Sequence, residues 1–258
     1  MNDHLKKNIL NILLGIIPVS KVRKNLRTKF LFANARNKIS ANDKLINQVN
    51  NNKLLIKGKN GTISDCLLKG LKVKFIGKNS TLIVHEPVIF EGCSVTIGNN
   101  STVEIFSTPY KILRMRISAT NSSTVVIGEN FSCRGCIIEN HDEPNLKVVI
   151  GKNCLFSYGI NLRVSDGHTL YQLNNNEIIN KPKEGITIGD HVWIGMKATV
   201  LKDVTIPPNS IVGADSLVNK SFDRENIIIA GTPAKIVKEN INWAHENTSN
   251  FAEQIVFC

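Results

Sequence analysis

The chain has 258 residues, of which 42% are hydrophobic, and this is enough to fold around one substantial core. Aromatic residues make up only 6%, so the core must be aliphatic, which favours many short strands with β-branched interiors. The formal net charge is +11, but no basic stretch alternates with aromatic residues, so we expect no nucleic acid partner. A polyphosphate cofactor, an anionic glycan or a phospholipid surface would each explain the charge.

Residues 1–50 are predicted to form a basic, helical segment ahead of the main fold. An apolar run covers Ile9 to Val19 and is followed directly by several basic residues, with no small-x-small cleavage site. The run is also too short to span a bilayer. A basic amphipathic helix fits residues 1–30, and it would either pack on the body of the protein or contact a membrane surface peripherally. We therefore expect a cytoplasmic protein, with the cytoplasmic face of the membrane as a second location.

Residues 51–222 are predicted to form a β-helix because their apolar residues recur with a period of six. Such a period fits a chain that turns a corner every six residues, so that three short strands make one coil and one residue per side points into a stacked core. Gly189, Gly195 and Gly213 each follow a residue of the period, and we expect them to permit the tight corners. The period is carried by Ile188, Ile194, Val200, Ile206, Val212 and Val218.

Looser copies of the unit precede this stretch at uneven intervals, so loops must interrupt the coils. Three of them run Val95–Asn100, Val125–Asn130 and Val148–Asn153, and each ends on an Asn that tolerates left-handed backbone at a corner. A non-repetitive insertion covers about residues 169–184. Stacked repeats need caps at both ends, and residues 223–258 are predicted to form the C-terminal cap and tail.

The pair Cys133-x-x-Cys136 is compatible with a metal or redox site. No second pair follows at matching spacing, which argues against structural zinc. We expect these cysteines to be buried thiols of a reduced protein, and we expect no metal requirement.

Two segments of the sequence resemble those of a known protein family. The stretch Ile188-Gly-Asp-His-Val-Trp-Ile-Gly-Met and the later Ala230-Gly-Thr-Pro-Ala-Lys look like those of the hexapeptide-repeat acyltransferases, nearest to enzymes that O-acetylate sugars, capsules or O-antigens. The resemblance covers about residues 51–240. It implies an all-β, left-handed parallel β-helix, an exception to the usual right-handed crossover. The predicted N-terminal helical segment and a short C-terminal extension flank this β-helix, and the N-terminal segment departs from the family's pattern. It also implies a homotrimer with active sites between subunits, acetyl-CoA as co-substrate and a carbohydrate acceptor.

His168 is the candidate catalytic base. Acyl transfer from a thioester to a hydroxyl needs a base, and a histidine suits that role near neutral pH. His168 lies directly before the insertion, and the family's base occupies the same place. Asp166 has two roles open to it, because it is spaced either to orient the imidazole or to cap the turn through its own side chain.

The resemblance assigns further residues to the substrate groove. It implies that Trp193 lines the groove beside the acceptor and that the Met196 backbone N–H stabilises the oxyanion. Tyr171 is a further acceptor candidate, chosen for its place in the insertion and not from the resemblance. A trimer-interface role for Trp193 stays open. The cofactor-binding candidates are Gly195, Met196, Gly213, Ala214, Lys220, Thr232, Pro233, Lys235 and Lys238.

The sequence thus predicts an acetyl-CoA-dependent O-acetyltransferase acting on a hydroxyl of a sugar or surface polysaccharide, such as a capsule or O-antigen. An N-acyltransferase for an amino sugar nucleotide would share fold, donor and base. A γ-type carbonic anhydrase would need three zinc-binding histidines, for which His141, His168 and His191 are available. A non-catalytic scaffold is disfavoured by the presence of His168.

Overall fold

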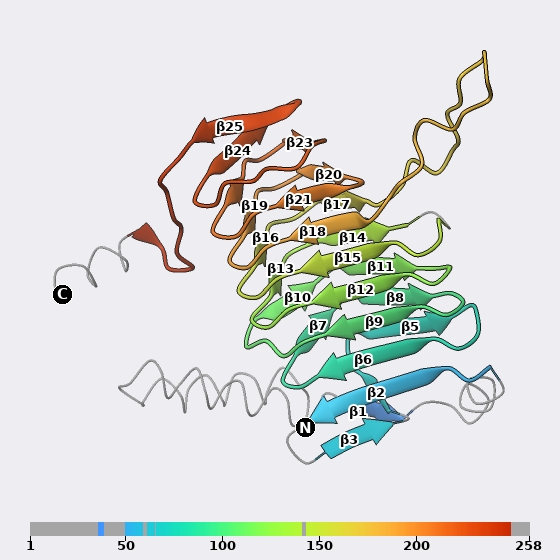
Figure 1. Cartoon of the computed structure of the whole chain (residues 1–258). Coiled ribbons are helices and arrows are strands. Elements are labelled where there is room, and N and C mark those ends of the chain that lie inside the picture. Colours follow the sequence, from blue (N-terminus) through green and yellow to red (C-terminus); the bar gives the residue numbers. More distant parts are fainter. Residues whose placement is uncertain (1–35, 39–49, 59–60, 65, 141–142, 249–258) are drawn as a thin grey trace.

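The computed structural model describes residues 36–38, 50–58, 61–64, 66–140 and 143–248. The amphipathic helix predicted for residues 1–30 lies outside these ranges. The described part is built from β-strands that form three parallel sheets, the faces of one three-sided coil (Figure 1). We number the faces 1, 2 and 3 in the order in which the chain visits them, and name each corner by the two faces that meet there.

Each face consists of strands from successive coils. Face 1 contains β5 (Leu71–Phe75), β8 (Cys93–Ile97), β11 (Met115–Ala119), β14 (Cys136–Glu139), β17 (Ile160–Arg163), β20 (Thr199–Leu201) and β23 (Leu217–Val218). Face 2 contains β2 (Lys53–Gly58), β3 (Gly61–Ser64), β6 (Thr81–His85), β9 (Thr102–Ile105), β12 (Thr124–Ile127), β15 (Lys147–Ile150), β18 (Gly185–Ile188) and β21 (Val204–Ile206). Face 3 contains β7 (Ile89–Glu91), β10 (Lys111–Leu113), β13 (Ser132–Cys133), β16 (Leu155–Phe156), β19 (Trp193–Ile194), β22 (Ile211–Val212), β24 (Ile228–Gly231) and β25 (Ala234–Lys238).

Antiparallel pairs terminate the parallel stack at both ends. At the N-terminal end β3 pairs antiparallel with β2, and β1 (Arg36–Lys38) pairs antiparallel with β4 (Cys66–Leu68). At the C-terminal end β25 folds back on β24. The β2–β3 and β24–β25 hairpins occupy backbone hydrogen-bonding groups that an open end of the coil would leave exposed to other chains.

The six-residue period marks the core, as the sequence predicts. Every residue of the period from Ile188 to Val218 is buried, with at most 1% of its surface exposed. Ile188 stacks on Ile206 in the next coil, and Ile194 stacks on Val212. A coil of three hexapeptides would pair each residue with the one 18 positions later, as Ile188 pairs with Ile206. Earlier coils contain extra residues, because Val103 pairs with Val125, which is 22 positions later. The period is therefore visible in the sequence only in the C-terminal coils.

The corners correct one expectation about the glycines. Left-handed backbone recurs every six residues, but at His191, Lys197 and Asp203 (φ 56°, 58° and 59°) instead of at Gly189 or Gly195. Gly195 is required for a different reason, because a Cβ there would lie 2.6 Å from the backbone nitrogen of Ala214 in the next coil. These glycines permit close stacking of coils, and other residues make the turn.

Asparagines take the left-handed positions in the earlier coils, in agreement with the prediction. Asn100, Asn130 and Asn153 have φ of 53°, 59° and 58°. Their short polar side chains tolerate this conformation better than other L-residues do.

Four cysteines are buried thiols, as expected. Cys93, Cys133, Cys136 and Cys154 are free and lie in the core, and burial raises the pKa of Cys133 to about 12. Within the described residues, no group of three or more His, Cys, Asp or Glu is arranged to hold a metal ion. None of the helices in the described part of the chain is long and apolar enough to cross a membrane.

Candidate active site

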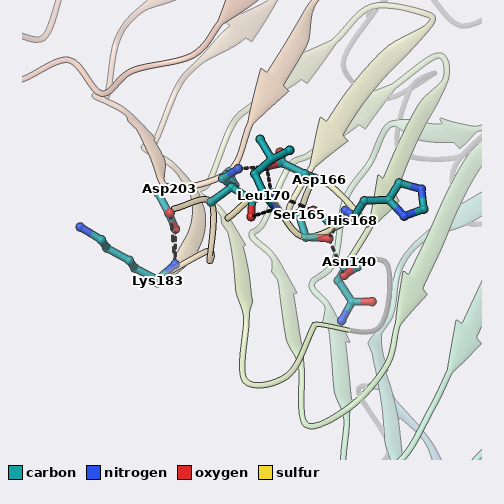
Figure 2. A network of polar contacts seen from close by, with 10 residues as sticks. Asn140, Ser165, Asp166, His168, Leu170, Lys183 and Asp203 are labelled. Atoms are coloured by element: carbon teal, nitrogen blue, oxygen red, sulfur yellow. Dashed lines mark hydrogen bonds and ion pairs between the residues drawn. The ribbon is translucent and has the colours of Figure 1, made fainter. Parts of the chain in front are cut away.

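His168 lies where the insertion leaves the coil. The chain departs from the 1/2 corner after β17 and returns at β18, and the segment between them projects from the body (Figure 1). The His168 side chain is exposed. Figure 2 shows its imidazole directed away from Asp166 and from the polar network at the base of the loop. The ring is therefore accessible to a second molecule.

Asp166 anchors the start of this insertion. Its carboxylate forms an ion pair with Lys202 and accepts a hydrogen bond of 2.7 Å from the Asn180 side chain. The same Asn180 amide donates to the backbone carbonyl of His168 at 2.8 Å. Hydrogen bonds from Lys202 and Asn180 hold the pKa of Asp166 below its usual range, against the opposing effect of partial burial. In the single chain Asp166 thus ties the two ends of the loop to the next coil.

Asp203 anchors the returning end of the insertion (Figure 2). Its Oδ1 accepts hydrogen bonds from the backbone N–H groups of Lys183 (2.9 Å), Glu184 (2.9 Å) and Gly185 (3.2 Å). Burial alone would raise the pKa of this carboxyl, but the three N–H donors outweigh it and the pKa is lowered.

Sequence reasoning missed Asn180, Lys202 and Asp203. The available signal was that the pair Lys202–Asp203 occupies the corner one coil after the insertion.

Trp193 points outward from face 3, with 38% of its surface exposed. Its ring lies 6.1 Å from that of Trp243, which belongs to the C-terminal tail. Trp243 stacks on His191 at 4.3 Å and donates a hydrogen bond from its indole nitrogen to the His191 carbonyl at 2.8 Å. The tail therefore folds against the 2/3 corner beside Trp193. The sequence analysis missed Trp243, although only two tryptophans are present.

Most of the predicted cofactor residues lie along the 3/1 corner. Met196 is exposed there, and its carbonyl accepts a hydrogen bond of 2.9 Å from the N–H of Asp215, which follows Ala214 in the next coil. The Thr232 hydroxyl donates to the Asp215 carbonyl at 3.4 Å, which brings the Thr232–Pro233 turn to the same corner. Gly195 and Gly213 precede Met196 and Ala214 in these two coils.

The remaining candidates lie elsewhere. Lys220 follows β23 toward the 1/2 corner, with its ammonium 5.8 Å from the centre of the Phe222 ring. Lys235 and Lys238 are exposed on β25. Tyr171 is exposed in the insertion, where it forms an isolated bridge with Ile178.

The two halves of the predicted site lie on opposite edges of face 1. His168 is at the 1/2 corner, whereas Met196 and Ala214 are at the 3/1 corner. One chain does not bring the base next to the oxyanion donor. Of the histidines named for a carbonic anhydrase, His168 lies at the 1/2 corner and His191 lies at the 2/3 corner with its ring packed on Trp243, while His141 lies outside the described residues.

Comparison with known proteins gives consistent matches. The family model "Bacterial transferase hexapeptide (six repeats)" matches residues 185–220. Polysialic acid O-acetyltransferase from Neisseria meningitidis is 35% identical over 66% of this chain and 88% of the relative. Galactoside O-acetyltransferase from Escherichia coli is 31% identical, over 66% of this chain and 76% of the relative. A polysialic acid O-acetyltransferase from Escherichia coli is 33% identical over 55% of this chain, which spans 45% of that protein's length.

Two solved structures share the fold. The polySia-specific acetyltransferase NeuO superposes with a TM-score of 0.65 at 28% identity, over 79% of this chain and 94% of that structure. The polysialic acid O-acetyltransferase OatWY gives a TM-score of 0.63, also at 28% identity, over 80% of this chain and 99% of that structure. These matches confirm the fold and the resemblance seen in the sequence. The chain therefore belongs to the hexapeptide-repeat acyltransferase family, as an O-acetyltransferase that uses an acyl-CoA donor on a left-handed parallel β-helix.

Proposed function

We propose that the protein transfers acetyl groups from acetyl-CoA to hydroxyl groups of an acidic capsule polysaccharide of the polysialic acid type. The observation that carries this proposal is the match to two polysialic acid O-acetyltransferase structures over 79% and 80% of the chain. The net charge of +11 supports it, since a basic protein attracts a polyanionic acceptor over long range.

In the proposed reaction the neutral imidazole of His168 takes the proton of the acceptor hydroxyl as its oxygen attacks the thioester carbonyl. The backbone N–H of Met196 donates to the oxyanion that develops on that carbonyl. The C–S bond then breaks, an ester forms, and the imidazolium returns its proton to the departing CoA thiolate. Asp166 acts by positioning the loop that carries His168.

The donor is proposed to lie along the 3/1 corner, with its pantetheine arm beside Gly195, Gly213 and Ala214. Thr232 and Pro233 form the turn next to this corner. Lys220, Lys235 and Lys238 are exposed and are proposed to attract the phosphates, because cations stabilise a nearby polyphosphate.

We also propose that the active enzyme is a homotrimer. The support is the separation of His168 from Met196 within one chain, which a second copy would overcome by placing its 3/1 corner against the first copy's insertion. Trp193 would then contact the acceptor or the neighbouring subunit, and Tyr171 would contact the acceptor.

The proposed location is the cytoplasm, with residues 1–30 as a peripheral membrane contact.

An acceptor panel tests the function. The full chain is incubated with acetyl-CoA and polysialic acid, a neutral capsule polysaccharide or a simple galactoside, and free thiol release is followed together with the mass of the products. Polysialic acid should gain acetyl esters fastest. Acetylation of the galactoside alone would contradict the polysaccharide assignment.

His168→Ala should lower kcat by roughly a thousandfold, because removal of a general base costs about 10²–10⁴-fold. Its Kd for acetyl-CoA, measured by calorimetry, should stay unchanged, since the base acts on the acceptor. His85→Ala is the control, because His85 lies on an early strand of face 2 beside Glu104. A His168→Ala enzyme with most of its activity would exclude this residue as the base.

A further inference from the structure

A basic groove runs along the 3/1 corner below the proposed donor residues, on the side of the earlier coils. It has a volume of ≈ 560 Å³ and is lined by Arg114, Arg116, Arg134 and the ring of Tyr158, with Gly135 and Gly159 among the remaining lining residues. All three arginines are exposed, and 48% of the Tyr158 surface is exposed. A concave site lined by one sign of charge concentrates ions of the opposite sign.

Within the described residues, none of the three guanidinium groups forms an ion pair. The nearby carboxylates are already engaged, because Glu91 pairs with Lys111 at 3.4 Å and Glu139 pairs with Arg163 at 3.9 Å. Arg114 donates from Nε to the backbone carbonyl of Arg134 at 3.3 Å, which leaves its terminal nitrogens available. Three arginines held together without counter-charges in a groove indicate an anionic ligand.

The groove adjoins the coil that carries the predicted oxyanion donor. The N–H of Lys197, the residue after Met196, donates to the Tyr158 carbonyl at 2.9 Å. On face 1 the basic surface continues toward the N-terminal end, since Arg116 is in register with Ser94 and Ser94 with Lys72. With strands about 4.8 Å apart, the stretch from Tyr158 to Lys72 is about 19 Å long, which suits an extended polymer better than a single ion.

We propose that this groove binds carboxylate groups of the acceptor polysaccharide outside the reacting sugar, with Arg116 and Arg134 as the main contacts. The planar guanidinium of arginine binds carboxylates through paired hydrogen bonds, which a lysine cannot form. Tyr158 supplies an apolar ring surface on which a sugar can pack at the end of the groove nearest Met196. The inference rests on the proposed function, because it takes the acceptor to be a polymer of carboxylate-bearing sugars.

The test compares two double variants that remove the same charge. R116Q/R134Q removes two cations from the groove, and K53Q/K147Q removes two exposed cations from face 2. Binding of polysialic acid fragments is measured without acetyl-CoA, and steady-state kinetics are measured with it. R116Q/R134Q should raise the Kd and the acceptor KM about tenfold, as expected for loss of charge-assisted hydrogen bonds, with kcat and the acetyl-CoA KM nearly unchanged. K53Q/K147Q should resemble the wild type.

Fragments whose carboxyl groups are reduced to alcohols provide the ligand-side control, and they should bind the wild type and R116Q/R134Q equally weakly. Equal binding of native fragments by the two double variants would overturn the inference. So would a rise confined to the acetyl-CoA KM, which would assign the arginines to the donor phosphates, or a change in oligomeric mass, which would make the groove an interface between copies. If the wild type binds through the groove but acetylates nothing, the proposed function fails, and the bound polymer is not an acceptor, while the recognition of carboxylates by the groove stands.

Discussion

At the scale of single residues, carboxylates at one corner position the loop that carries the candidate base. Asp203 has left-handed backbone and accepts hydrogen bonds from three backbone N–H groups. Lys202, the residue before Asp203, forms an ion pair with Asp166. Both carboxyls have a lowered pKa in the folded protein. The loop is therefore held by ionised groups, and its order depends on their charge.

Asp203→Asn should loosen the returning end of the insertion, because Asn keeps the left-handed backbone but removes the charge. Hydrogen exchange at residues 183–185 should accelerate roughly tenfold, since hydrogen bonds to charged groups are stronger than neutral ones. A group with a lowered folded pKa stabilises above its unfolded pKa of about 3.9 and loses this effect as the pH falls through the folded value. The protection factors of the wild type should therefore decrease once the pH drops below about 4, and those of the variant should not change with pH. Unchanged exchange in the variant would rule out Asp203 as an anchor.

At the scale of the element, most strands of the coils place alternate residues in the core and at the surface. In β18 the side chain of Ile188 is 1% exposed between Ile150 and Ile206, whereas Thr187 faces outward. The regular C-terminal coils repeat this division on each of their three faces, so stacking buries a continuous aliphatic column. The stability of each strand thus depends on the coils above and below it.

Ile188→Asp should prevent folding or leave the protein insoluble, because an unpaired charge in the apolar column costs several kcal/mol. Thr187→Asp introduces the same side chain one residue earlier and should change the melting temperature by only a few degrees. Circular dichroism and light scattering compare the two variants. A soluble Ile188→Asp protein with native melting would mean that the register is wrong.

At the scale of the whole molecule, the single chain distributes its candidate site over two edges of one prism. His168 occupies the 1/2 corner, and the proposed donor residues Met196 and Ala214 occupy the 3/1 corner. A cyclic trimer can unite these edges, since each subunit presents one edge to each neighbour. Under the trimer proposed above, activity requires assembly.

Mixed trimers test this shared site. His168→Ala removes the base, and Ala214→Trp fills the proposed donor groove at an exposed position, so each variant alone should be inactive. Co-expression at equal levels should restore about a quarter of the wild-type activity, because one site in four then combines an intact base with an intact groove from the neighbour. The recovered activity is measured as thiol release by the whole trimer population purified after co-expression. No recovery would mean that each chain builds its own site.

The sequence by itself determined the architecture and the family. The six-residue period is a local signal, because each coil repeats the same inward positions, and it predicted the buried column from Ile188 to Val218. The Asn residues at corners were readable for the same reason, since left-handed backbone selects residue type at a single position. His168 could be singled out because a non-repetitive insertion interrupts a regular pattern directly after it.

Only the tertiary structure decided which residues meet across coils. Gly195 is needed because of Ala214 in the next coil, and Asp166 pairs with Lys202, which is far along the chain. The groove arginines come from coils of unequal length, so no fixed spacing brings Arg114, Arg134 and Tyr158 together in the sequence. The register between neighbouring coils depends on the number of residues in each corner loop. That number is set by packing between coils, and it cannot be predicted from local residue preferences.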